Sequence, residues 1–185
     1  MRPGNSEVQG QGAAGAAREA VPRAAVSGIP CTSAAFAELS AEILQAGVAL
    51  RFRARGASMA PLVRDGDVLL VRPVTAGSVR VGDVVLCTLE SGAPGRVVVH
   101  RVVRRLAGPD GCQFMVQGDA VARPDGVIGE AQVYGRVVAI ERDAARIDMD
   151  QPVMRMLGWL AALRSRWGLG RRGSPLRLTT RLGKM

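Results

Sequence analysis

The chain has 185 residues, a length that suits one domain of ordinary size with a tail at each end. Hydrophobic residues make up 48%, so a core can form, but aromatic residues make up only 3%, so that core must consist mainly of Val, Leu, Ile and Ala. The net charge of +9 divides into +1 for residues 1–33 (3 Arg, 2 Glu), +2 for 34–142 (13 Arg, 11 acids) and +6 for 143–185 (8 Arg and 1 Lys, 3 Asp). The basic end suits an anionic lipid surface, nucleic acid or plain solvation, and we expect no specific nucleic-acid partner.

Cysteine and histidine are too scarce for several classes of site. The three cysteines, Cys31, Cys87 and Cys112, form no C-x-x-C pair, and His100 is the single histidine. A disulfide framework and a zinc site are therefore not expected, and we expect no metal and no cofactor. The sequence also lacks a run of roughly 20 apolar residues and a secretory signal, which predicts a cytoplasmic or peripherally membrane-associated protein.

The N-terminal part of the chain divides into a tail and a short helix. Residues 1–33 are rich in Gly, Ala, Ser, Gln and Pro without apolar periodicity, which predicts disorder. A helix is indicated next by the spacing of Phe36, Leu39, Ile43 and Leu44, with Thr32 or Ser33 as N-cap and Gly47 at its end.

A strand and a sharp turn follow this helix. Apolar and basic residues alternate over 48–55, which is the pattern of a half-buried strand. Gly56 ends the strand, and Pro61 prevents backbone pairing from continuing. Ser58 therefore lies on a turn just past a strand end, where its hydroxyl is either turned to its own backbone or presented to a cleft.

The middle of the chain alternates between short apolar runs and turns built from Gly, Pro and Asp, which favours strands. We expect strands at 68–72, 84–89, 97–106, 112–117 and 132–142, and a Pro/Gly loop at 120–131. The Gly-Asp pairs at Asp67 and Asp83 are interpreted as turns. The result is a mainly β, mostly antiparallel domain over residues 34–142, with one helix in front.

Residues 143–185 form a separate basic tail in this interpretation. Within it, residues 152–167 carry an apolar stripe flanked by arginines and two tryptophans, which predicts an amphipathic helix. That helix either packs on the β domain or a partner, or lies at a membrane interface. Residues 168–185 are expected to be disordered.

One possible reacting pair stands out among the side chains. His100 is the natural candidate for a general base near neutral pH, because the single lysine, Lys184, is the next-to-last residue. A serine needs such a base to become a nucleophile, and the base benefits from a carboxylate behind it. Asp119 and Asp125 both lie in the segment after the next strand and could return to the same end of the sheet.

Several motifs in order resemble the type I signal peptidase superfamily, whose clan includes the self-cleaving SOS-repressor-type peptidases. They are Gly56-Ala57-Ser58-Met59-Ala60-Pro61, Gly66-Asp67-Val68, Val81-Gly82-Asp83-Val84-Val85, His100-Arg101-Val102-Val103, Gly118-Asp119-Ala120 with Asp125, and Gly135-Arg136-Val137-Val138. The resemblance covers about residues 50–142. A histidine before Arg-Val-Val is similar to the archaeal and endoplasmic-reticulum branch, whereas the bacterial branch has lysine there.

The resemblance implies a serine endopeptidase on a signal-peptidase-like β fold that cuts an extended peptide with small side chains near the scissile bond. Ser58 would be the nucleophile, His100 the base, Asp125 the residue that orients the base, and Asp119 a supporting residue. Residue 56 is glycine where the family often has Ser or Thr, so backbone N–H groups, including that of Ser58, would stabilise the oxyanion. This glycine and the lack of a transmembrane tether motivate an alternative, an inactive module of the same fold that binds an extended peptide or a partner protein.

Overall fold

The structure is a computed structural model and describes residues 33–90, 96–109 and 111–166. The predictions of disorder for most of 1–33 and for 168–185 lie outside these residues. The elements are α1 (Ser33–Gln45), β1 (Leu50–Arg53), β2 (Val68–Pro73), the 3-10 helix η1 (Ala76–Ser78), β3 (Val84–Leu89), β4 (Arg96–Gly108), β5 (Gly111–Gln117), β6 (Gly126–Gly129), the 3-10 helix η2 (Glu130–Gln132), β7 (Val133–Arg142), β8 (Ala145–Asp148) and α2 (Pro152–Arg166).

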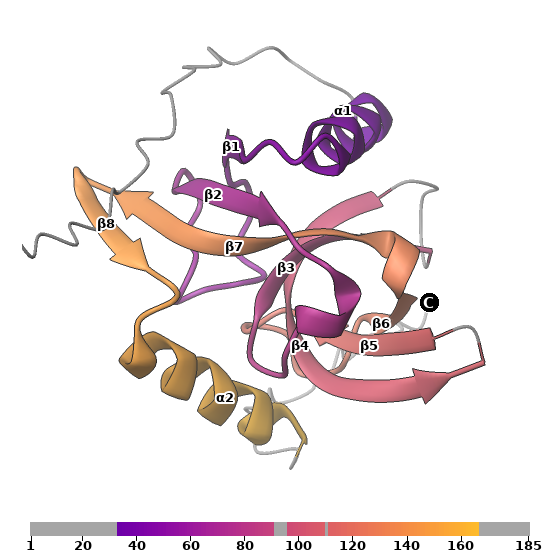
Figure 1. The fold of residues 1–185 in the computed structure, drawn as a ribbon. Coiled ribbons are helices and arrows are strands. Elements are labelled where there is room, and N and C mark those ends of the chain that lie inside the picture. Colours follow the sequence, from indigo (N-terminus) through magenta and orange to yellow (C-terminus); the bar gives the residue numbers. More distant parts are fainter. Residues whose placement is uncertain (1–32, 91–95, 110, 167–185) are drawn as a thin grey trace, which may run out of the picture.

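The strands form one antiparallel sheet in the order β1-β2-β7-β3-β4-β5-β6, with β8 paired to β7. Figure 1 shows this strongly curved sheet between the two helices. The prediction of a mainly β, antiparallel fold with a short N-terminal helix and a C-terminal helix is confirmed. The sheet continues past residue 142, where the sequence placed the end of the β domain, because β8 pairs with β7.

Strand β3 is central to the sheet because it contributes to two separate apolar cores. Val84 and Leu86 belong to a core that also holds Leu44, Leu69 and Ile140. The alternate residues of β3, Val85 and Cys87, belong to a second core with Val102, Phe114, Val116 and Ile128. A strand that is covered on both faces needs apolar residues at consecutive positions, which accounts for the valine doublets of this chain.

Helix α1 packs on the first core, as predicted, but not with every residue expected. Leu44 is buried, and the ring of Phe36 meets that of Phe52 edge-on with 5.2 Å between centroids. Leu39, predicted to belong to the buried stripe, is 49% exposed, because the buried line of the helix runs through Ala37 and Ser40 instead. The helix ends at Gln45, and Gly47, the predicted capping glycine, follows it with a positive φ, while the N–H of Val48 donates to the carbonyl of Ile43.

Two short strands were not predicted. β6 lies within the expected Pro/Gly loop at 120–131 and has only four residues. β8 is joined to β7 by a turn in which Asp143 and Ala144 have positive φ, so the glycine that usually indicates such a hairpin is missing.

Asp67 is more than the turn residue predicted from its Gly-Asp pair. Its side chain is 4% exposed and accepts two hydrogen bonds from the Arg142 guanidinium and one from the Arg64 N–H. The hydrogen bonds from Arg142 hold the pKa of Asp67 below its usual range despite burial. This ion pair fastens the loop after β1 to the end of β7.

Helix α2 approaches the sheet closely at two glycines. A Cβ atom on Gly158 would lie 2.7 Å from the carbonyl oxygen of Gly82, and a Cβ atom on Gly82 would lie 2.8 Å from the N atom of Trp159. Ala162 is fully buried in the same contact face. The helix therefore packs on the β domain through its small residues, which was one of the predicted alternatives.

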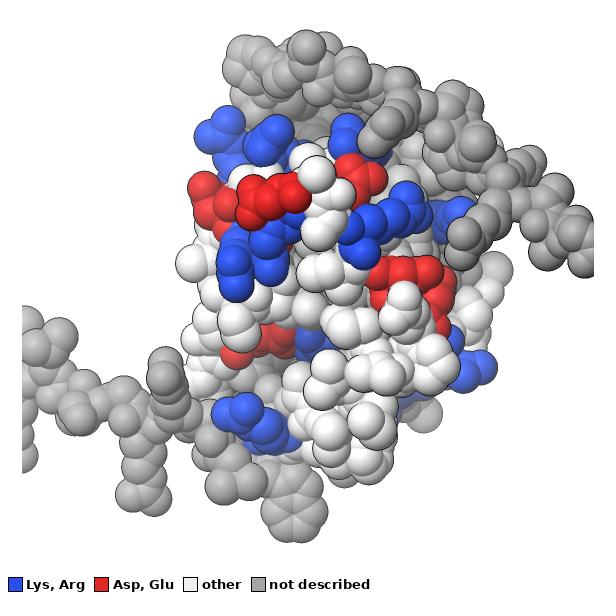
Figure 2. All heavy atoms as spheres, turned by 90° about the vertical axis from the view of Figure 1, so that its left-hand side faces the viewer, with Lys and Arg blue, Asp and Glu red and all other residues white. Residues whose placement is uncertain are grey.

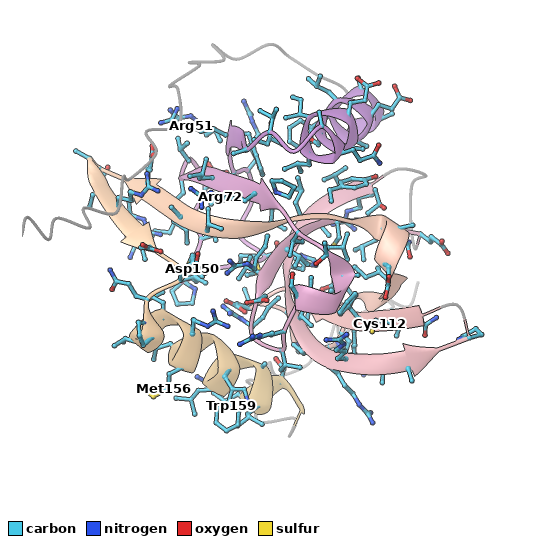
Figure 3. All side chains as sticks on the ribbon, viewed as in Figure 1. Arg51, Arg72, Cys112, Asp150, Met156 and Trp159 are labelled. Carbon is cyan, nitrogen blue, oxygen red and sulfur yellow. The ribbon has the colours of Figure 1, made fainter. Side chains whose placement is uncertain are left out.

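Most of the large apolar side chains of α2 face outward, although Met154 is half-buried and packs against the first core. Exposed fractions of 43–59% are found for Val153, Met156, Leu157, Trp159 and Leu160. Figure 3 shows Met156 and Trp159 on the side of α2 that points away from the sheet. Figure 2 shows a mostly uncharged surface in its lower part, where α2 lies, and mixed basic and acidic side chains above it. Among the described residues, no helix combines the length and apolar character needed to cross a membrane.

Candidate active site

The turn that carries Ser58 is fixed at both ends. At its base, the N–H of Ala54 donates to the carbonyl of Asp67, and the N–H of Gly66 donates to the carbonyl of Ala54. Next to the serine, the Met59 side chain is 3% exposed and belongs to the first core. Ser58 itself is exposed. A buried anchor beside an exposed serine holds the hydroxyl at the surface in a defined place.

His100 lies in the middle of β4, directly opposite Val85 of β3, and is 2% exposed. Its Nε2 atom is 3.2 Å from the Oγ atom of Ser58. The two residues that the sequence predicts as nucleophile and base are thus within hydrogen-bonding reach, although 42 positions separate them in the chain.

Asp125 lies on the other side of the imidazole. Its Oδ2 atom is 3.1 Å from Nδ1 of His100, although this nitrogen makes no well-aligned hydrogen bond. The same Oδ2 atom accepts a hydrogen bond of 2.9 Å from the N–H of Gly118, which fixes the carboxylate. A carboxylate only accepts hydrogen bonds, so it favours the tautomer with the proton on Nδ1, which leaves the lone pair of Nε2 for the serine hydroxyl.

Burial is the main influence on the titration of His100. Burial lowers the pKa of this imidazole, Asp125 acts in the opposite direction, Arg96 lowers the pKa, and Asp119 raises it. The lowered pKa keeps the ring neutral near pH 7, which is the form that can accept a proton. Cys87 is no rival nucleophile, because burial, with a smaller effect of Asp125, raises the pKa of its thiol to about 12.

Asp119 occupies a different place from Asp125. Both of its carboxylate oxygens accept hydrogen bonds from the Arg101 guanidinium, at 2.7 and 2.6 Å. The third guanidinium nitrogen of Arg101 donates to the carbonyl of Gly82 at 2.8 Å. Asp119 therefore reaches the site through Arg101 and its loop and makes no contact with the imidazole of His100.

The loop at 118–125 also holds the serine turn directly. The N–H of Ala120 donates to the carbonyl of Ser58 at 2.9 Å. A Cβ atom on Gly118 would lie 2.6 Å from that same carbonyl oxygen, so only glycine allows the loop and the turn to approach this closely. One loop thus contacts both the serine and the histidine.

Backbone N–H groups at the turn are available for a ligand. Within the described part of the chain, the N–H groups of Ser58 and Met59 donate to no acceptor. Gly56 has φ of +93°, so a serine or threonine at this position would be strained. The glycine that departs from the resembled pattern is thus suited to this backbone.

Ser58, His100, Asp119 and Asp125 were predicted from the sequence as site residues, whereas no role was predicted for Arg101. The signal in the sequence was the position of Arg101 within a run of valines, which indicates a buried strand. In the structure Arg101 is only 3% exposed, and a buried arginine requires a partner. For metals, no group of three or more His, Cys, Asp or Glu side chains that could hold an ion is found among the residues described.

We expect Arg101→Gln to destabilise the protein by about 3 kcal/mol, because Asp119 would be left nearly buried without its cation. Urea unfolding measures this, and hydrogen exchange at the Ala120 N–H should become faster as the loop loosens. The double variant Arg101→Gln/Asp119→Asn should recover part of the loss. Arg104→Gln, on the same strand but exposed, is the matched control; equal losses in the two single variants would contradict this role of the ion pair.

Comparison with known proteins gives a family match over residues 8–138, well over half of the chain, to the model described as Peptidase S24-like. None of the curated proteins compared matches the chain in sequence. The matched span contains Ser58, His100, Asp119 and Asp125. The chain belongs to the Peptidase S24-like family, within the clan of serine peptidases that also includes the signal peptidases.

Proposed function

We propose that the protein is a serine endopeptidase in which Ser58 is the nucleophile and His100 the general base, oriented by Asp125. The observation that carries the proposal is the proximity of three groups: Ser58 Oγ is 3.2 Å from one imidazole nitrogen, and an Asp125 oxygen is 3.1 Å from the other. Family membership supports a peptidase fold and a peptide or protein substrate in general.

The reaction follows the usual order for such groups. Nε2 of His100 takes the hydroxyl proton of Ser58 while Oγ attacks the peptide carbonyl, and the free N–H groups of Ser58 and Met59 are candidates to stabilise the oxyanion. The intermediate collapses to an acyl-enzyme as the imidazolium gives its proton to the leaving amine. His100 then takes a proton from water, which hydrolyses the ester.

The strand order suggests where a substrate would bind. β1 and β6 are the two ends of that order, and Ser58 follows β1 while Asp125 directly precedes β6. An extended peptide can pair with such an edge strand. Cleavage beside small side chains, and signal-peptide processing in particular, stay predictions that rest on the resemblance alone.

We expect Ser58→Ala and His100→Ala each to lower kcat/KM for a cleaved peptide by roughly a thousandfold or more, since each removes a member of the reacting pair. Circular dichroism checks that both variants fold, and Ser78→Ala, at an exposed serine of η1, is the control. A fluorophosphonate probe should label Ser58 in the wild type and fail in the His100 variant. Absence of labelling in the wild type would favour the alternative, an inactive module that binds an extended peptide or partner.

The pH dependence should report His100 directly. Because burial lowers its pKa, activity should be constant near neutral pH and fall in acid with an apparent pKa below the usual 6.5 of free histidine. Asp125→Asn removes the charge that raises this pKa, so the acid limb should move to still lower pH while kcat falls roughly a hundredfold or more. Glu38→Gln, an exposed carboxylate of α1, should leave the profile unchanged. An acid limb that does not move in Asp125→Asn would contradict the coupling.

Peripheral membrane contact through residues 152–167 is a second proposal, favoured by the exposed apolar face of α2. The double variant Met156→Gln/Leu160→Gln should reduce sedimentation with anionic vesicles severalfold, because it removes apolar area that an interface would bury. Leu39→Gln, at an equally exposed leucine of α1, is the control. Equal pelleting of the wild type and the double variant would refute membrane contact.

A further inference from the structure

A cavity of about 310 Å³ lies between the end of β2, the turn before β3, strand β7 and the start of α2. The charged side chains that line it are Arg72, Arg80, Arg136, Arg155, Asp83 and Asp150. Four arginines against two aspartates leave an excess of two positive charges. Figure 3 marks the region by the labels of Arg72, on β2, and Asp150, just before α2.

Three of the four arginines form no ion pair with an acidic side chain in the described part of the chain. Arg136 pairs with Asp150 at 2.6 Å. No carboxylate among the described residues forms an ion pair with Arg72, Arg80 or Arg155. The two lining aspartates therefore balance only part of the positive charge, and an excess of two remains.

The placement of two of these arginines is unfavourable for the sheet itself. Arg72 of β2 and Arg136 of β7 are directly opposite each other in the antiparallel pair. Like charges at directly opposite positions destabilise a sheet. Asp150 compensates Arg136 alone, so an anion that contacts both guanidinium groups would relieve the repulsion.

The number of donors favours phosphate over a carboxylate. The arginines come from four separate segments and surround one volume, so several guanidinium groups can donate at once. A phosphate group offers three or more oxygens around a tetrahedral centre, whereas a carboxylate offers two in one plane. Arginine suits bidentate contacts with phosphate.

An apolar space adjoins this charged cavity. A second cavity of about 190 Å³ shares Arg80, Asp83, Arg136 and Arg155 with the first. The rest of its lining is Gly82 and a set of apolar side chains, namely Val81, Val84, Val137, Met149, Met154 and Trp159. Trp159 also belongs to the exposed face of α2. A ligand with a phosphate and an apolar portion would match both spaces.

We propose that this cavity binds a phosphate group, carried either by a soluble phosphate ester or by a phospholipid headgroup. The site is separate from the proposed active site, because neither Ser58 nor His100 lines it. Phosphate binding can therefore be tested independently of peptidase activity, and we expect variants of the cavity to leave peptidase activity unchanged.

The test uses the full chain with two kinds of probe. Isothermal titration calorimetry with inorganic phosphate and with glycerol 3-phosphate measures the soluble source. Sedimentation with phosphatidylcholine vesicles that contain phosphatidylglycerol measures the lipid source. Arg72→Gln and Arg80→Gln should each weaken binding about tenfold, and added salt should weaken it further.

Two further variants sharpen the readout. Asp150→Asn removes the carboxylate that competes for Arg136, so it should strengthen phosphate binding severalfold. Arg104→Gln makes the same charge change outside the cavity and should have no effect. If only the net charge of the protein mattered, Arg104→Gln would weaken phosphate binding as much as Arg72→Gln or Arg80→Gln does. If the cavity is a site, only the two variants inside it weaken binding.

Each outcome of these measurements either supports or overturns the phosphate site. Saturable binding of either soluble probe that is weaker in Arg80→Gln supports the site and a soluble ester. Vesicle binding that is weaker in Arg72→Gln and Arg80→Gln, without soluble binding, supports the site and a lipid headgroup. No binding of any probe, equal loss in Arg104→Gln, or binding of a polyglutamate peptide in place of phosphate overturns the proposal.

Discussion

The arrangement depends on one buried imidazole that must keep a different partner on each nitrogen. His100 is 2% exposed, and its imidazole lies between the hydroxyl of Ser58, on the Nε2 side, and the carboxylate of Asp125, on the Nδ1 side. Burial is the largest influence that lowers its pKa, and the carboxylate of Asp125 opposes it, so the ring is neutral near pH 7 but can still be protonated. A strand in the middle of a sheet fixes the ring far better than a loop would, because β3 and β5 pair with β4 on both sides.

The residue next to His100 extends this arrangement to the opposite face of the strand. Successive side chains of a strand point to opposite sides, so His100 and Arg101 diverge. Their acidic partners, Asp125 and Asp119, nevertheless lie in the same loop. The loop is thereby held from both faces of β4, and its Ala120 N–H binds the serine turn between these two contacts. Ser58 and His100 are positioned by the same short segment.

The features that could be predicted from the sequence are strands with a regular apolar pattern and residues that belong to a recognisable motif. β3 and β5 follow from apolar runs between turns, and the serine, histidine and two aspartates were candidates because the chain has a single histidine and because all four stand in motifs of the resembled family. β6 and β8 were missed because four residues give too little periodicity and because Asp143 and Ala144 replace the expected glycine. The arginine cavity could not be predicted, since its side chains come from four segments whose proximity only the fold creates.

Helix α2 shows why an amphipathic pattern does not determine which face of a helix packs on the rest of the protein. Periodicity suggests that the large apolar residues face the sheet. Of these, Met154 packs against the first core, but the closest contact is made by Gly158 and Ala162, because only small residues allow the approach to Gly82. At that contact, a Cβ atom on Gly158 would lie 3.0 Å from a guanidinium nitrogen of Arg101. The same guanidinium holds Asp119. Helix α2 and the loop that carries Asp125 are thus joined through the side chain of Arg101, while most of the large apolar residues of the helix remain exposed.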